Sequence, residues 1–134
     1  MNEIRPTGFP SNCFLRQVTI PSGASVSELC PTQGMALIGI FTDRAGWTAA
    51  AIGYRTTWSG NLGDVVTMYD SAGGYEQTLV STNAAAAGVY IAIPQTDTLF
   101  APWVQLTSRT AGTDNAVTQG ADRTLTLVFR NYLN

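Results

Sequence analysis

Residues 123–130 read RTLTLVFR, in which the apolar residues Leu125, Leu127 and Phe129 alternate with mostly polar neighbours. An alternation with a period of two predicts a β-strand with one buried face. Residues 50–58, AAIGYRTTW, alternate in the same way. These two stretches, together with the turn residues Gly, Asn, Asp and Pro between them, favour an all-β protein.

Other segments of the chain fit the same description. The nine expected strands are residues 13–20, 24–29, 35–42, 50–58, 65–69, 76–80, 89–93, 103–109 and 123–130. A single helical turn is expected at residues 84–87, where four alanines follow Asn83. Short strands separated by turns predict a single-domain β-sandwich or a jelly-roll-like barrel of about eight to nine strands.

The first part of the chain differs from the rest. Pro6 and Pro10 oppose both helix and central strand, so residues 1–12 are expected to form an extended N-terminal arm before a β-sandwich domain at residues 13–134. The arm carries the apolar residues Ile4 and Phe9 next to Arg5, and Tyr132 and Leu133 follow the last strand. Apolar anchors on extended segments gain by ordering against a neighbour. All five residues are therefore interface candidates.

Composition limits the partners and the chemistry. The 134 residues include seven basic residues, all Arg, and nine acidic ones, for a net charge of −2. Nucleic-acid binding is not expected, because it normally needs a basic stripe. The absence of His removes Ser-His-Asp and Cys-His catalysis and imidazole metal ligation. We expect no enzymatic activity, no metal and no cofactor.

The N-terminus, the apolar stretches and the cysteines indicate the cellular compartment in which the chain is made. The N-terminus lacks the pattern of a secretory signal, and the most apolar stretches are shorter than the roughly 18–20 residues needed to span a bilayer. We therefore expect a soluble protein made in a cytoplasm, without membrane partners. Cys13 and Cys30 are expected to be reduced core residues, and the alternative is one disulfide between them.

Few residue types remain for a site. Six aspartates lie in predicted turns, where this residue usually caps the backbone: Asp43, Asp64, Asp70, Asp97, Asp114 and Asp122. The three tryptophans are expected to anchor the core, and the alternative is a platform for a sugar or a base: Trp47, Trp58 and Trp103. Three arginines form either a patch for an acidic partner or a solvated face with turn pairing, such as Arg123 with Asp122: Arg109, Arg123 and Arg130.

Two longer stretches resemble a known family. The first consists of residues 34–60, GMALIGIFTDRAGWTAAAIGYRTTWSG, and residues 65–74, VVTMYDSAGG. The second consists of residues 88–130, which end in QGADRTLTLVFR. Their order of strands, WT-x-A motif, turns and Asp-Arg-x-Leu close is similar to that of head decoration, or cement, proteins of tailed bacteriophages. The resemblance covers about residues 18–130. The turn at residues 59–64 departs from it, because it lacks the usual Asp-Gly followed by Trp.

The resemblance implies a structural virion protein without enzymatic activity. Such a protein would bind the outside of a capsid and lock capsomers together. The expected partners are the major capsid protein and further copies of the chain, as a homotrimer or, second, a dimer. The rival hypothesis is a carbohydrate- or receptor-binding β-sandwich of a phage tail or fibre, in which some tryptophans would be exposed.

Overall fold

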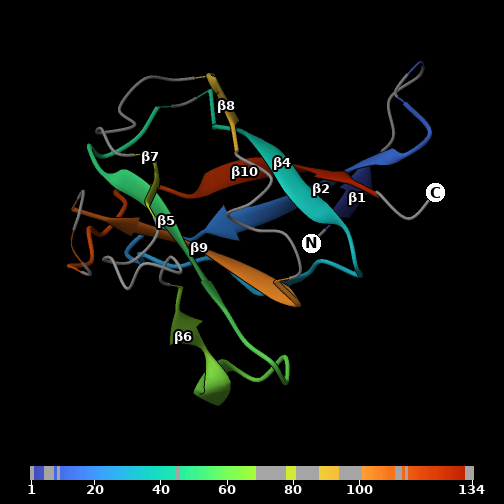
Figure 1. Cartoon of the computed structure of the whole chain (residues 1–134). Coiled ribbons are helices and arrows are strands. Elements are labelled where there is room, and N and C mark those ends of the chain that lie inside the picture. The colour runs from blue at the N-terminus through green and yellow to red at the C-terminus, as the bar shows by residue number, and fades with distance from the viewer. Residues whose placement is uncertain are drawn as a thin grey trace.

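The structure is a computed structural model that describes residues 2–4, 8, 10–44, 46–68, 78–80, 88–93, 101–110, 113 and 115–131. Within these residues ten strands form two antiparallel sheets (Figure 1). The expected all-β sandwich is confirmed, and the two sheets do not close into one barrel. The helical turn expected at residues 84–87 lies outside the described residues.

The first sheet has the strand order β1-β2-β10-β4-β8. Its members are β1 (Asn2–Ile4), β2 (Cys13–Ile20), β10 (Arg123–Arg130), β4 (Ala36–Phe41) and β8 (Tyr90–Ala92). Strand β10 pairs along its whole length with β2. It also pairs with β4 from Thr126 to Arg130, with a register shift between Val128 and Phe129. The alternating stretch RTLTLVFR is therefore the central strand of this sheet.

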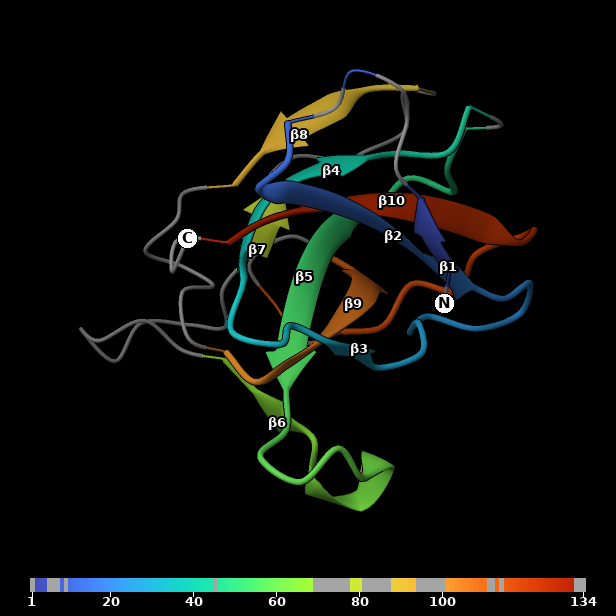
Figure 2. The same cartoon turned by 90° about the vertical axis from the view of Figure 1, so that its right-hand side faces the viewer.

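The second sheet has the order β3-β9-β5-β6, and β7 also pairs with β5. Its members are β3 (Cys30–Pro31), β9 (Trp103–Arg109), β5 (Ala51–Thr56), β6 (Val66–Thr67) and β7 (Thr78–Val80). Figure 2 shows β5 running crosswise to β2 and β10, with the two sheets stacked on each other. In both views β6 and the 3-10 helix η1 (Leu62–Asp64) project away from the stacked sheets.

The core lies between the sheets and takes side chains from both. The first sheet contributes Val18, Ile20, Leu37, Ile40, Leu125, Leu127 and Phe129, and the second contributes Cys30, Ile52, Tyr54, Val104 and Leu106. The predicted buried face of β10 is confirmed, because Leu125, Leu127 and Phe129 are each 0% exposed. Burial of these side chains supplies the main favourable contribution to folding.

The strand expected at residues 24–29 is wrong in its bounds. Only Val26 makes an isolated bridge, to Thr107, and the ladder with β9 begins again at Cys30. Between them the Ser27 hydroxyl accepts the Leu106 N–H at 3.0 Å, in addition to the bond from Ser27 N–H to the Leu106 carbonyl at 2.9 Å. A side chain thus replaces a backbone acceptor, and the regular ladder is interrupted.

The N-terminal arm begins as an edge strand. Asn2, Glu3 and Ile4 pair with Gln17, Arg16 and Leu15 of β2 in the same chain. An edge position is the one that a Pro-rich neighbourhood allows, since a second partner strand would need N–H groups that proline lacks. The start of the arm therefore extends the first sheet.

Candidate functional site

The segment that leads from β5 to β6, residues 57–66, carries three exposed large apolar side chains, two of which are the most exposed among the described residues, and we call it the tip. Trp58 is 69% exposed, Leu62 is 71% exposed and Val66 is 46% exposed. Large apolar side chains placed together in water gain about 1.5–3 kcal/mol each when a partner buries them. Several exposed large apolar side chains on one projecting segment are typical of an interaction site.

Hydrogen bonds inside the tip hold its backbone in one shape. The Thr57 hydroxyl is buried, accepts the Ser59 N–H at 3.3 Å and donates to the Asn61 carbonyl at 3.4 Å. The Ser59 hydroxyl donates to the Asp64 carboxylate at 2.5 Å and accepts the Asn61 N–H at 3.1 Å. Because these bonds exist before any partner binds, less conformational entropy is lost on binding.

Gly60 joins the tip to the sandwich. Its φ is +79°, a left-handed conformation that side chains rarely adopt. A Cβ atom at this position would lie 2.6 Å from the Trp103 ring, so the half-buried indole packs directly against the Gly60 backbone. The ring of Trp103 at the start of β9 therefore supports the base of the tip.

The three tryptophans have different environments, and the prediction that all three anchor the core is wrong for Trp58. Trp47 is 7% exposed and belongs to the core, Trp103 is half-buried, and Trp58 is exposed. Alternation from Ile52 and Tyr54 placed Trp58 on the inner face, but β5 ends at Thr56 and the alternation ends with it. The turn residues that follow Trp58 in the sequence were the available signal that the strand ends near this position.

The five interface candidates from the chain ends have little described structure. The backbone of Ile4 lies in β1, paired with Leu15. Arg5, Phe9, Tyr132 and Leu133 lie outside the described residues. Their part in an interface stays a prediction.

A second exposed aromatic pair lies at the β8 edge of the first sheet. Phe41 and Tyr90 are directly opposite each other in register, 45% and 49% exposed, with ring centroids 4.6 Å apart. The Tyr90 ring covers Gly39, where a Cβ would lie 2.0 Å from its hydroxyl oxygen. This pair packs against its own sheet, whereas the tip segment projects away from its sheet.

The arginines expected as a possible patch are not gathered in one place. Arg109 is 1% exposed on β9, Arg130 is exposed at the end of β10, and Arg123 is half-buried at its start. Arg123 Nε donates to the Gln119 side-chain oxygen at 3.1 Å, while Asp122 accepts the Ser22 N–H at 2.8 Å. Asp122 therefore binds a backbone amide, that of Ser22, and the described hydrogen bond of Arg123 goes to Gln119.

Two more aspartates have described partners, and these are not the backbone of their own turns. Asp43 accepts the Thr124 N–H at 2.9 Å, and Asp64 accepts the Ser59 hydroxyl. Asp70, Asp97 and Asp114 lie outside the described residues. Among the residues that the structure describes, no group of three or more Cys, Asp or Glu side chains could hold a metal ion.

Both cysteines are free thiols on different sheets. Cys30 is 0% exposed in β3, and Cys13 is half-buried at the start of β2. Burial raises the pKa of the Cys30 thiol, and the nearby Arg16 guanidinium opposes this rise. The core cysteine is thus a neutral, poorly reactive thiol.

No helix in the described part of the chain is long and apolar enough to cross a membrane. No protein-family model matches the chain, and no curated protein or solved structure is similar enough to match it. The exposed side chains of the tip can bury apolar surface on a partner.

Proposed function

We propose that this chain is a structural virion protein that binds the outer surface of a phage capsid and stabilises contacts between capsomers. The observation that carries the proposal is the tip, where Trp58, Leu62 and Val66 are exposed on a loop with internal hydrogen bonds. Interface hot spots are enriched in aromatic anchors of this kind, and rigid presentation increases affinity. The sequence resemblance to decoration proteins supplies the identity of the partner.

The tip would insert into an apolar depression of the major capsid protein. Attachment through a small contact is weak by itself, because stable interfaces usually bury about 1,200–2,000 Å² in total. Several copies of the tip on one oligomer would raise the avidity of attachment without any new contact. We therefore expect a homotrimer, with a dimer as the second choice, and light scattering during size-exclusion chromatography measures the mass directly.

The test is co-sedimentation of the purified chain with empty heads assembled from the capsid protein of the same genome. Trp58→Ser should weaken attachment at least tenfold, since it removes one hot-spot side chain worth about 2 kcal/mol or more. Tyr90→Ser is the matched control, because it removes an aromatic side chain of comparable exposure from the other sheet. Equal loss in both variants, or in neither, would contradict a docking role for the tip.

Trp58 also favours the rival function, a carbohydrate- or receptor-binding module, because exposed indole rings stack on sugars. Titration with glycans would then change the fluorescence of the wild-type chain and leave that of Trp58→Ser unchanged. If empty heads protect Trp58 from acrylamide quenching and glycans do not, the capsid proposal is supported over this rival. The reverse pattern would support the rival.

A further inference from the structure

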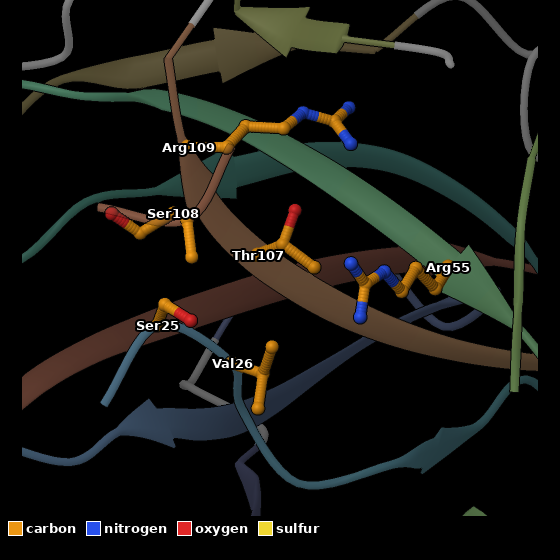
Figure 3. Close-up of a pocket in the computed structure, with 7 residues that line it drawn as sticks. Ser25, Val26, Arg55, Thr107, Ser108 and Arg109 are labelled. Carbon is orange, nitrogen blue, oxygen red and sulfur yellow. The ribbon is translucent and has the colours of Figure 1, made fainter. Parts of the chain in front are cut away.

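Two features of the described residues differ from the tip: a cavity beside β9 and the outer edge of β8. The cavity has a volume of about 150 Å³, and Figure 3 shows Arg55 and Arg109 on its lining. Both arginines already interact with other groups of the chain, so the cavity offers no free cation to a ligand. The outer edge of β8 carries polar backbone groups of another kind, which face away from β4.

Strand β8 is the outermost strand of the first sheet, and among the described strands only β4 pairs with it. Figures 1 and 2 both place it beside β4 at the outside of the sheet. Tyr90 is 49% exposed and Ala92 is also exposed. The rest of the chain therefore leaves both residues accessible to a partner.

The hydrogen bonds to β4 determine which backbone groups of β8 face outward. Two backbone bonds of 2.9 Å flank the strand, Thr42 N–H to the Val89 carbonyl and Ile93 N–H to the Ile38 carbonyl. In an antiparallel ladder, hydrogen-bonded pairs alternate with pairs that make no hydrogen bonds. Every second residue from Val89 onward therefore bonds to β4, and the N–H and carbonyl groups of Tyr90 and Ala92 point to the outer edge.

This edge lacks the features that usually prevent pairing with another chain. Exposed edge strands of soluble proteins are commonly short, or carry a charge or a proline. Glu3 lies in β1, Pro31 lies in β3, and β6 is only two residues long. Residues 88–93, GVYIAI, contain neither a charged residue nor a proline. Nothing in the sequence of the β8 edge therefore opposes a further strand.

The outward groups of β8 are complementary to the same groups of a second copy. If two β8 strands lie antiparallel about a twofold axis at Ile91, Tyr90 of each copy lies opposite Ala92 of the other. Each of these pairs exchanges two backbone hydrogen bonds, so every outward N–H meets a carbonyl. The small Ala92 side chain leaves room for the Tyr90 ring, and no like charges are brought together.

We propose that β8 pairs with β8 of a second copy of this chain, which joins the two first sheets into one continuous sheet. The paired segment is short, so the contact buries less than the roughly 1,200 Å² of a standard interface, and the dimer should be weak. A twofold contact supports the dimer rather than the homotrimer. The inference does not rest on the capsid proposal, because it concerns an edge that is separate from the tip.

Sedimentation-velocity ultracentrifugation of the full chain, from about 1 µM to about 1 mM, measures the association directly. The wild type should shift from monomer to dimer as its concentration rises. Ala92→Pro should stay monomeric over this range, because it removes an N–H that faces away from β4 at an edge where proline is tolerated. Ala92→Ser is the matched control, since it keeps that N–H and should dimerise as the wild type does. Circular dichroism checks that both variants are folded.

Hydrogen exchange locates the contact in the wild type without any variant. The amides of Tyr90 and Ala92 should exchange more slowly at high than at low protein concentration, while those of the tip should not change. Tyr90→Ser keeps both outward backbone groups and should still dimerise, so its use as a control for the tip is unaffected.

Three results would overturn the proposal. The first is a chain that stays monomeric or forms a trimer. The second is a dimer that Trp58→Ser abolishes and Ala92→Pro leaves intact, since the tip would then be the contact between copies. The third is a monomer whose β8 amides become protected only on empty heads, since a strand of the capsid protein would then occupy the edge.

Discussion

Gln119 forms hydrogen bonds to three separate segments of the chain, at Thr48, Ser108 and Arg123. It is 0% exposed, and its amide nitrogen donates to the Ser108 hydroxyl at 2.7 Å and to the Thr48 carbonyl at 3.0 Å. Its oxygen accepts the Thr48 N–H at 2.9 Å and Arg123 Nε. A buried amide whose donors and acceptor are all used fixes the loop at Thr48 to the ends of β9 and β10.

We predict that Gln119→Ala lowers the free energy of unfolding by about 2–3 kcal/mol, because it leaves buried partners unsatisfied. Urea unfolding followed by circular dichroism measures the loss. The control is Gln17→Ala, which removes one bond to Thr126 at 3.2 Å from a half-buried position and should cost about 0.5–1 kcal/mol. Similar losses in the two variants would show that Gln119 is not the connecting residue.

The two thiols should differ in reactivity. In the folded chain Cys13 should react with a thiol reagent at pH 8 well before Cys30, which is buried and has a raised pKa. Because ionisation is easier in the unfolded state, the stability due to the neutral Cys30 thiol is present below pH 9.0, its ordinary pKa, and is lost as pH rises through the folded-state pKa. Peptide mapping by mass spectrometry identifies the modified residue. Faster modification of Cys30 would contradict its burial.

Single residues also show the limit of sequence reasoning. The burial of Leu125 and Phe129 follows from their alternation, which is a local property of the chain. The position of Arg109 does not, because its guanidinium lies above Gly53, 56 positions earlier, which becomes its neighbour only after β5 and β9 pair. Likewise, the partners of Gln119 come from segments that meet only in the folded protein.

At the scale of the elements, the tip contains a matched pair of glycines. Gly60 has a φ of +79° and contacts the Trp103 ring, whereas a Cβ on Gly63 would meet nothing within 4 Å. We predict that Gly60→Ala destabilises the chain by about 1–2 kcal/mol or more, through backbone strain and the clash of its Cβ with the Trp103 ring, and that Gly63→Ala leaves it unchanged or slightly more stable. Thermal unfolding measures both. Equal stability of the two variants would show that Trp103 does not support the tip through Gly60.

Strand β1 leads to a different prediction. Deleting residues 1–10 removes three paired residues from an edge and should cost about 1–2 kcal/mol while the sandwich stays folded. It should also weaken attachment to empty heads, because the deletion removes Ile4, Arg5 and Phe9. Phe9→Ser is the companion variant, since it keeps the β1 residues. If the truncated chain binds heads as tightly as the intact one, the arm plays no part in attachment.

Element bounds were predictable where pairing is regular. Residues 13–20, 103–109 and 123–130 were expected as strands and are β2, β9 and β10 with the same bounds. The expected strand at residues 65–69 is shorter, with β6 at Val66–Thr67, and residues 24–29 are interrupted at Ser27. In both places a side chain or a turn competes with strand pairing for the backbone hydrogen bonds. The alternation of apolar and polar residues contains no information about that competition.

At the scale of the whole molecule, the all-β sandwich follows from alternation and turn spacing, and the function does not. The tip is recognisable only once β5 has ended and Trp58, Leu62 and Val66 are seen to be exposed together. Low charge and a β-sandwich are compatible with many binding proteins. The exposed tip makes one orientation on a partner more favourable than others, and this orientation can be observed.

The most direct measurement is a cryo-electron microscopy reconstruction of empty heads incubated with the purified chain. The capsid proposal predicts added density on the outer surface at a fixed lattice position, with the β5–β6 tip against the capsid and the sandwich outside it. Density in which the tip points to solvent, or heads that remain bare while the chain binds elsewhere on the virion, would contradict the proposal.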